Sequence, residues 1–464
     1  GAAISIVNRI GYKGLDEIKV EGGTFTANGT NAAVKAYDWD NTNKTESDFT
    51  QAAKVSVSGG TFSSEVDKSL CAKGYIPTQN TDGTYSVKEG KYVAEIGSQG
   101  YESLTEAVAA AEDGQTVRLL ADATEDVVIS KSITLDLGGK TLTNTNAGKA
   151  TISVQSGTVT VKNGNVVGGT SYYNIEVTKG SNANLTLTDV TATAGNTGSS
   201  MIDNYGTLTI TSGTYTGGLN VVKSEEGSVL NISGGTFTRE TAPRWGITGT
   251  VLVYGTTTIT GGTFNEKSTS TNARVVVTGR VNGYASITYV KGGTFNGNGN
   301  NVFHHLSPAQ ADDSFEVLGG TFNKSIPDYY CAEGFIPTKN ADGTYGVKEG
   351  HYVAAVGSKK YETLADAIRL AAKGKTVKLL ADVADCGSLT ISKNITLDGG
   401  GHTISGNSSI SVNMPGNAAA DVTIKNVNFK DIANGNKLSA FYFSQVKGKL
   451  TITENNVDHV LLKS

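Results

Sequence analysis

The chain has 464 residues and a net charge of −4, and it contains no apolar run near the roughly 18 residues that a membrane-spanning helix needs. Charged residues make up 18% and hydrophobic residues 38%, so the composition excludes a highly charged disordered chain and gives no reason to expect nucleic acid as a partner. There are 58 glycines but only 3 cysteines, which excludes a fold held together by many disulfides.

A short phrase recurs from the start of the chain: apolar residues at alternate positions, followed by Gly-Gly-Thr-Phe. Period-two alternation is typical of strands, and paired glycines make a sharp corner because they adopt positive φ without a Cβ clash. Repetition at this spacing predicts a solenoid whose coils stack as parallel strands around one continuous core. The phrase ends at Phe25, Phe62, Phe237, Phe264, Phe295 and Phe322.

An antiparallel β-sandwich is the alternative fold, because it is also rich in short strands and glycine turns. Sandwich strands differ from one another, whereas stacked coils need the same side chain at the same place in every coil. The fixed corner phrase therefore favours an all-β parallel β-helix.

A longer repeat organises the chain, since residues 59–142 match residues 319–404. In both copies two short strand patterns flank an Asp-Gly turn, which predicts a β-hairpin. An amphipathic stretch follows, and we predict short capping α-helices at about 102–112 and 362–372. Ser103, with Glu106 three residues later, has the spacing of a helix N-cap.

Each predicted helix can cover the first coil of a β-helix, because an uncovered coil would expose apolar surface and free strand edges. This interpretation divides the chain into five segments. They are the C-terminal coils of one β-helix at 1–62, a hairpin connector at 63–90, a complete β-helix with its helical cap at 91–325, a second connector at 326–350, and the cap and first coils of a further β-helix at 351–464.

The helical lid followed by stacked coils resembles the right-handed parallel β-helix of the pectin-lyase-like superfamily. The Gly-Gly-Thr-Phe coils and the repeated hairpin and helix also resemble large surface proteins of gut anaerobic bacteria. The resemblance covers nearly the whole chain and implies architecture, because such folds serve both enzymes and adhesins. Family hydrolases carry Gly-His-Gly and Arg-x-Lys; here Thr403 follows Gly401-His402, and no Arg-x-Lys exists.

Catalytic residues are not evident in the sequence. Glycoside hydrolysis normally needs two carboxylates on either side of one bond, and the sequence shows no recurring outward acidic pair one coil apart; Asp203 stands isolated. His304 and His305 are adjacent on a predicted strand and point to opposite faces, so they cannot easily share a metal ion. We therefore predict no catalytic residue, no metal and no cofactor. A polysaccharide lyase or glycoside hydrolase with an unrecognised active site is the alternative.

Irregular loops that leave the coils are the candidate ligand-binding regions. The loop at 238–250 carries Arg239, Arg244 and Trp245, the loop at 27–50 carries Trp39, and Tyr172 follows a pair of glycines. Exposed aromatic rings beside polar groups suit contact with sugars or proteins. The alternative is that Trp245 and Trp39 only cover the open side of a coil.

These features favour a non-enzymatic surface or secreted protein, an adhesin or stalk that contacts a glycan or a host protein through its side loops. A purely structural spacer is a further possibility. The chain opens inside a repeat and without a signal peptide, so we expect a piece of a longer extracellular or cell-surface protein that does not itself insert into a membrane.

Overall fold

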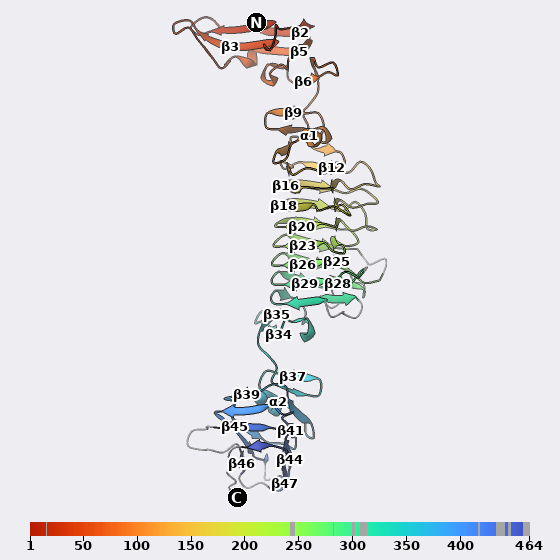
Figure 1. The fold of residues 1–464 in the computed structure, drawn as a ribbon, viewed down its shortest axis with the longest axis vertical. Helices are drawn as coiled ribbons and strands as arrows, with labels where there is room; N and C mark the ends of the chain where they lie inside the picture. The colour runs from red at the N-terminus through yellow and green to blue at the C-terminus, as the bar shows by residue number, and fades with distance from the viewer. Residues whose placement is uncertain are drawn as a thin grey trace. The chain divides into compact units, whose positions relative to one another are not determined.

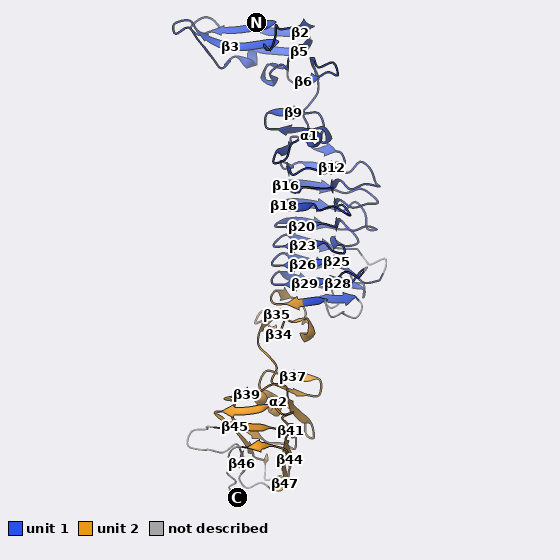
Figure 2. Cartoon of the chain, viewed as in Figure 1, with its two compact units in different colours: residues 1–315 blue, residues 316–464 orange. Residues whose placement is uncertain are grey.

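The computed structural model describes all residues except 15, 242–245, 282, 299–301, 307–312, 416–417, 433–440, 444–446 and 458–464. The chain divides into two compact units, residues 1–315 and 316–464 (Figure 2). Strands of both units wind as a parallel β-solenoid, with about 16 turns in all. The predicted all-β fold class is therefore confirmed.

Three ladders of parallel strands build the long solenoid of the first unit (Figure 1). The first ladder contains β13 (Thr134–Asp136), β16 (Thr158–Val167), β18 (Asn184–Thr193), β20 (Thr207–Ile210), β23 (Val229–Ile232), β26 (Thr256–Ile259) and β29 (Ile287–Val290). The second, here called the corner ladder, runs from β14 (Thr141–Thr143) through β16 and β18 to β21 (Gly213–Thr216), β24 (Thr236–Arg239), β27 (Thr263–Glu266) and β30 (Thr294–Asn296).

A separate sheet of 8 strands forms the third ladder. Its strands are short, and every pair of neighbours is parallel and in register. The third ladder contains β12 (Val127–Ile129), β15 (Ile152–Val154), β17 (Ile175–Val177), β19 (Ile202–Asn204), β22 (Val222–Ser224), β25 (Thr248–Val253), β28 (Ala273–Gly279) and β31 (Phe303–Leu306).

Aromatic rings of the corner phrase stack inside the solenoid. Tyr215, Phe237, Phe264 and Phe295 are register partners on successive coils and are fully buried. Their ring centroids lie 4.9–5.0 Å apart, with interplanar angles of 7–10°. This spacing is close to the strand separation of a sheet, so backbone pairing and ring stacking support the same register.

The two glycines of the corner phrase serve different purposes. The second adopts positive φ, as at Gly262 with φ 96°, which a side chain would strain. The first glycine does not adopt positive φ. At Gly261, which is such a first glycine, a Cβ would lie 2.3 Å from the carbonyl oxygen of Ser233 on the preceding coil. Only the second glycine is therefore explained by the predicted positive φ; the first permits the close approach of stacked coils.

Both predicted capping helices are present, as α1 (Leu104–Ala110) and α2 (Leu364–Leu370). The Ser103 hydroxyl accepts a hydrogen bond from the backbone N–H of Glu106 at 3.1 Å, which confirms the predicted N-cap. At the other end, the Lys131 ammonium donates to the carbonyls of Ala109 and Ala111 at 2.7 and 2.6 Å. Lys393 makes the same contacts to α2, so both helix ends are satisfied by side chains.

The predicted hairpins are also confirmed. In the first unit β6 (Tyr75–Gln79) pairs with β7 (Tyr85–Glu89), and in the second β34 (Phe335–Lys339) pairs with β35 (Tyr345–Glu349), both antiparallel. The Asp82 carboxylate accepts hydrogen bonds from the Thr84 backbone and hydroxyl, which fixes the turn.

Residues 1–62 form parallel pairs, as expected for stacked coils. The strands β1 (Ile4–Arg9) and β3 (Val34–Asp40) pair in parallel, and β4 (Thr45–Ser47) adds to the edge of β3. A second sheet joins β2 (Ile18–Phe25) and β5 (Val55–Phe62) in parallel and continues into the hairpin of β6 and β7. The rings of Phe25 and Phe62 stack at 5.1 Å, which repeats the corner packing described above.

The second unit repeats the construction with its own three ladders. After the short pair β36 (Ala354–Val356) and β37 (Lys359–Tyr361), α2 covers the first coil, and its Leu364, Ala367 and Ile368 are buried in the core. The ladders are β38 (Thr376–Leu379), β41 (Thr396–Asp398), β44 (Ala420–Lys425) and β47 (Gly448–Thr453); β39 (Val383–Ala384), β42 (Thr403–Gly406), β45 (Asn428–Ile432) and β48 (Asn456–Val457); and β40 (Gly387–Ile391), β43 (Ser408–Val412) and β46 (Phe441–Phe443).

Candidate functional site

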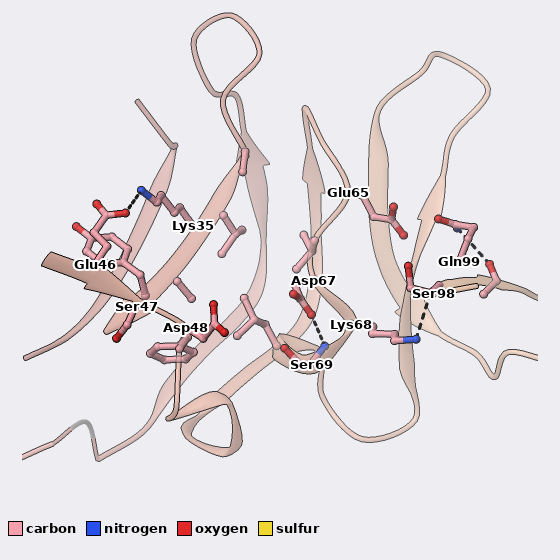
Figure 3. Close-up of a pocket in the computed structure, with 18 of the residues that line it drawn as sticks. Lys35, Glu46, Ser47, Asp48, Glu65, Asp67, Lys68, Ser69, Ser98 and Gln99 are labelled. Atoms are coloured by element: carbon pink, nitrogen blue, oxygen red, sulfur yellow. Dashed lines mark hydrogen bonds and ion pairs between the residues drawn. The ribbon is translucent and has the colours of Figure 1, made fainter. Parts of the chain in front are cut away.

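An open groove of about 890 Å³ lies in the first unit, and we call it the N-terminal groove. Three stretches of chain line it: residues 32–37 with 46–49, residues 65–70, and Tyr92 with residues 98–100. Figure 3 shows labelled side chains from all three stretches, with Lys35, Glu46, Ser47 and Asp48 on one side and Glu65, Lys68, Ser98 and Gln99 on the other. The groove therefore combines the loop at 27–50, which the sequence singled out, with two segments that it did not.

Asp38 anchors the loop that forms one wall of this groove. It is buried at 3% exposure on β3, and its carboxylate accepts hydrogen bonds from the Asn8 amide at 3.0 Å and from the Thr50 hydroxyl at 2.6 Å. Burial opposes ionisation, but these hydrogen bonds lower the pKa of Asp38 below its usual value. The carboxylate thus ties the end of the loop to two strands, so the lining residues start from a fixed base.

The groove lining combines aromatic rings with hydrogen-bonding groups. Tyr37, Phe49 and Tyr92 supply the rings, and the Lys35 ammonium lies 4.7 Å from the centre of the Tyr37 ring. Lys35 also pairs with Glu46 at 2.6 Å, a hydrogen bond that raises the pKa of this exposed lysine. Aromatic rings and charged groups therefore line the same groove.

Further polar contacts hold the opposite wall. The Lys68 ammonium donates to the carbonyl of Ser98 at 3.2 Å, and the Asp67 carboxylate accepts from the Ser69 N–H at 2.8 Å (Figure 3). Tyr92 donates its hydroxyl to the carbonyl of Pro77 at 3.2 Å, and burial, then nearby Glu65, raise its pKa to about 12. Tyr92 is therefore neutral, and its hydroxyl is held by a backbone partner.

Charge in the lining is unbalanced toward acid. The lining contains two lysines and four acidic side chains, those of Glu46, Asp48, Glu65 and Asp67. Within the part of the chain that the structure describes, no group of three His, Cys, Asp or Glu side chains is placed to hold a metal ion. The acidic lining favours neutral or basic ligand groups over anions.

The predicted binding residues lie in different surroundings. Trp39 is half-buried on β3, in register with Arg9 of β1 and Glu46 of β4, and it is not among the groove-lining residues. Arg239 is in the interior with no exposed surface; its Nε donates to Glu266 at 2.6 Å and its Nη1 to Thr248 at 2.6 Å. Arg244 and Trp245 lie outside the described residues.

Tyr172 belongs to a second polar site, on the outer side of the third ladder, which we call the outer cluster. Its ring centre lies 4.5 Å from that of Tyr173, and burial, then nearby Glu176, raise the pKa of Tyr172. The outer cluster consists of the charged residues Glu176, Asp203, Lys223 and Glu225 and the tyrosines Tyr172, Tyr173, Tyr205 and Tyr254.

The isolation predicted for Asp203 is wrong. Glu176 of β17, Asp203 of β19 and Lys223 of β22 are register partners on three successive coils. Their strand neighbours Ile202 and Val222 are fully buried, so the three charged residues share the opposite, outer face. Asp203 is therefore not isolated.

Burial gives Asp203 unusual properties for an outward side chain. It is only 1% exposed, and its two carboxylate oxygens find no hydrogen-bond donor among the described residues. Burial, and then the neighbouring Glu225 carboxylate, raise the pKa of Asp203 to about 7. In its protonated form Asp203 can donate to Glu225, which meets the need for a partner.

Glu225 connects the acid to a lysine. It is 4% exposed, and its Oε1 is in direct contact with the Lys223 ammonium. Although burial opposes it, this contact raises the pKa of Lys223. Burial, then Glu225 and Asp203, raise the pKa of Tyr205 to about 12, so the tyrosines beside the cluster remain neutral.

No protein-family model matches the chain, no curated protein matches it, and no solved structure matches it. Neither α1 nor α2, the two α-helices among the described residues, is long and apolar enough to cross a membrane.

Proposed function

We propose that this chain is a non-enzymatic β-helix protein of a cell surface or a secreted assembly, and that it binds a glycan in the N-terminal groove. The observation that carries the proposal is the groove lining, which holds the rings of Tyr37, Phe49 and Tyr92 together with charged side chains such as the Lys35–Glu46 pair. Sugars offer apolar ring faces and many hydroxyls, and such a surface complements both.

The groove charge narrows the class of glycan. Four acidic side chains and two lysines line it, so carboxylated or sulfated sugars would meet repulsion. We infer a neutral oligosaccharide as the ligand. We also propose that the chain is related to the pectin-lyase-like superfamily, because of its repeated coils, hairpins and helical caps.

A glycan array tests the proposal, followed by titration calorimetry with the strongest neutral oligosaccharide. Replacing Tyr37 with alanine removes a groove ring, and we expect affinity to fall about tenfold, or about 1.4 kcal/mol. Tyr329→Ala is the matched control, because Tyr329 is 72% exposed and lies in the second unit. Binding only to purified host proteins would show that the ligand is a protein and not a glycan. Equal losses of affinity in both variants would show that the N-terminal groove is not the binding site.

A polysaccharide-cleaving enzyme is the second candidate, because Glu176 and Asp203 form a carboxyl pair on neighbouring coils. Cleavage of a glycoside uses such a pair. The binding protein is preferred because a catalytic acid must reach the glycosidic oxygen, whereas Asp203 is only 1% exposed. Incubation with pectin, mucin and other polysaccharides, with detection of new reducing ends or unsaturated products, would establish the enzyme if turnover occurs.

A further inference from the structure

We propose that Lys223 and Asp203 become joined by an intramolecular amide bond between their side chains, with Glu225 carrying the protons. The site is the charged part of the outer cluster, and the inference does not depend on glycan binding in the N-terminal groove. The bond would tie two neighbouring coils of the solenoid together covalently.

Register places the two reacting residues side by side. Asp203 and Lys223 are paired Cα partners on β19 and β22, so their backbones lie about 4.8 Å apart, and both side chains leave the same face. Lysine has a long flexible stem, which lets its amine move to the neighbouring carboxyl without a backbone shift.

Glu225 contacts both reactants. Its Oε1 touches the Lys223 ammonium, and its carboxylate hydrogen-bonds the Asp203 carboxyl when Asp203 holds a proton. One carboxylate therefore lies between the amine that must lose protons and the hydroxyl that must gain one. This is the placement required of a general base that later acts as a general acid.

The reaction balances with these three groups alone. Glu225 takes a proton from the Lys223 ammonium, and the freed amine attacks Cγ of protonated Asp203, forming the N–C bond. Glu225 returns its proton to the departing hydroxyl, the C–O bond breaks, and water leaves. The nitrogen then loses one further proton to Glu225, so an ammonium, a carboxylic acid and a carboxylate become an amide, one water and a protonated Glu225.

The surroundings favour condensation over its reversal. Asp203 and Glu225 are 1% and 4% exposed. Beside them are half-buried Tyr173 and Tyr205, whose pKa values are raised first by burial and then by the two carboxyls. Burial favours the neutral carboxyl of Asp203, which is the electrophilic form. Holding amine and carboxyl in one fixed geometry removes the entropic cost of bringing them together.

The lack of a hydrogen-bond donor for either oxygen of Asp203 in the described part of the chain also supports the proposal. A buried carboxylate without a donor is costly in a folded protein, and Asp203 is in that position whenever it is ionised, because neither of its oxygens finds a donor among the described residues. In the amide the acid is gone, and the remaining carbonyl needs only one donor. The bond would thus remove an unfavourable buried group and link two coils.

Intact-mass spectrometry of the full-length folded protein tests the proposal. We expect the mass to fall short of the sequence mass by one water, and protease digestion to yield a branched peptide that contains both Asp203 and Lys223. A mass equal to that of the sequence, or loss of water without the branched peptide, would overturn the proposal.

Variants separate the roles of the three residues. Lys223→Arg keeps the positive charge beside Glu225 but lacks the reacting amine, and Glu225→Gln keeps the size of the proton carrier but not its basicity; we expect both to retain the full sequence mass. Lys179→Arg is the control, because Lys179 is an exposed lysine paired with Glu226 at 3.5 Å, and it should still lose water. Since Glu225→Gln leaves both reacting residues in place, water loss equal to wild type in that variant would contradict the role of Glu225 even if Lys223→Arg failed to fold.

Discussion

The corner ladder and the third ladder belong to the same coils but differ in what they repeat. In the corner ladder the same glycines and rings return on each coil, as at Phe237, Phe264 and Phe295. On the outer face of the third ladder the residue changes at every step, from Glu176 to Asp203 to Lys223. Repetition holds the coils together, and the unusual chemistry gathers where repetition stops.

The largest expected effect comes from breaking the repeated side. Phe264→Ala removes a ring from the middle of a buried stack and should lower the free energy of unfolding by about 3–5 kcal/mol. Tyr284→Ala, at a residue that is 53% exposed, should cost far less. Denaturant titration of both variants measures the difference, and similar costs would show that the rings do not hold the coils together.

The next largest effect on stability should come from a first corner glycine, where neighbouring coils approach closely. Gly261→Ala places a methyl group 2.3 Å from the Ser233 carbonyl, and such overpacking should cost about 1–3 kcal/mol. Gly22→Ala is the control: Gly22 is also the first glycine of a corner phrase and, like Gly261, does not have positive φ, but a Cβ there has nothing within 4 Å. If the control variant lost as much stability in denaturant as Gly261→Ala, backbone conformation rather than coil contact would explain the glycines.

The third ladder should respond to pH where the corner ladder does not. In Lys223→Arg, where Asp203 stays a free acid, the raised pKa of about 7 means that the folded state holds this proton more tightly than the unfolded state. Stabilisation is then complete below the ordinary aspartate pKa and disappears as pH rises through about 7. Unfolding measured across this range should show the fall, and it should vanish in Lys223→Arg/Asp203→Asn.

The smallest effect concerns the helical caps. Lys131→Met removes the ammonium that satisfies two carbonyls at the end of α1 and should lower stability by about 0.5–1 kcal/mol. Lys393→Met should behave alike at α2. Thermal melts compare the two, and no change in either variant would mean that water replaces the lysine without loss.

The sequence predicts what is local or repeated. Strand alternation, glycine corners and the Ser103 cap depend on neighbouring residues, so their patterns are visible without the fold. Asp203 and Lys223 become partners only when the length of each coil is known, and coil lengths vary. The N-terminal groove joins three separate stretches, of which only the loop containing Trp39 carried a signal in its composition.

The separate role of the first corner glycine was also hidden. Its need arises from a carbonyl on another coil, as at Gly261 and Ser233, and no local pattern reports that distance. The same holds for Arg239, which the sequence placed among loop residues but which is buried against Glu266. Polar residues near a strand end can face either side, and the pairing partner decides which.

Hydrogen exchange with and without the strongest-binding neutral oligosaccharide tests most directly that function lies in the non-repeating parts of the chain. Binding in the N-terminal groove should slow exchange of amides in residues 32–37, 46–49 and 65–70, while the corner ladder stays unchanged. The account would be contradicted if the protein were saturated with sugar and amide exchange slowed only in the corner ladder, or did not slow in those three stretches.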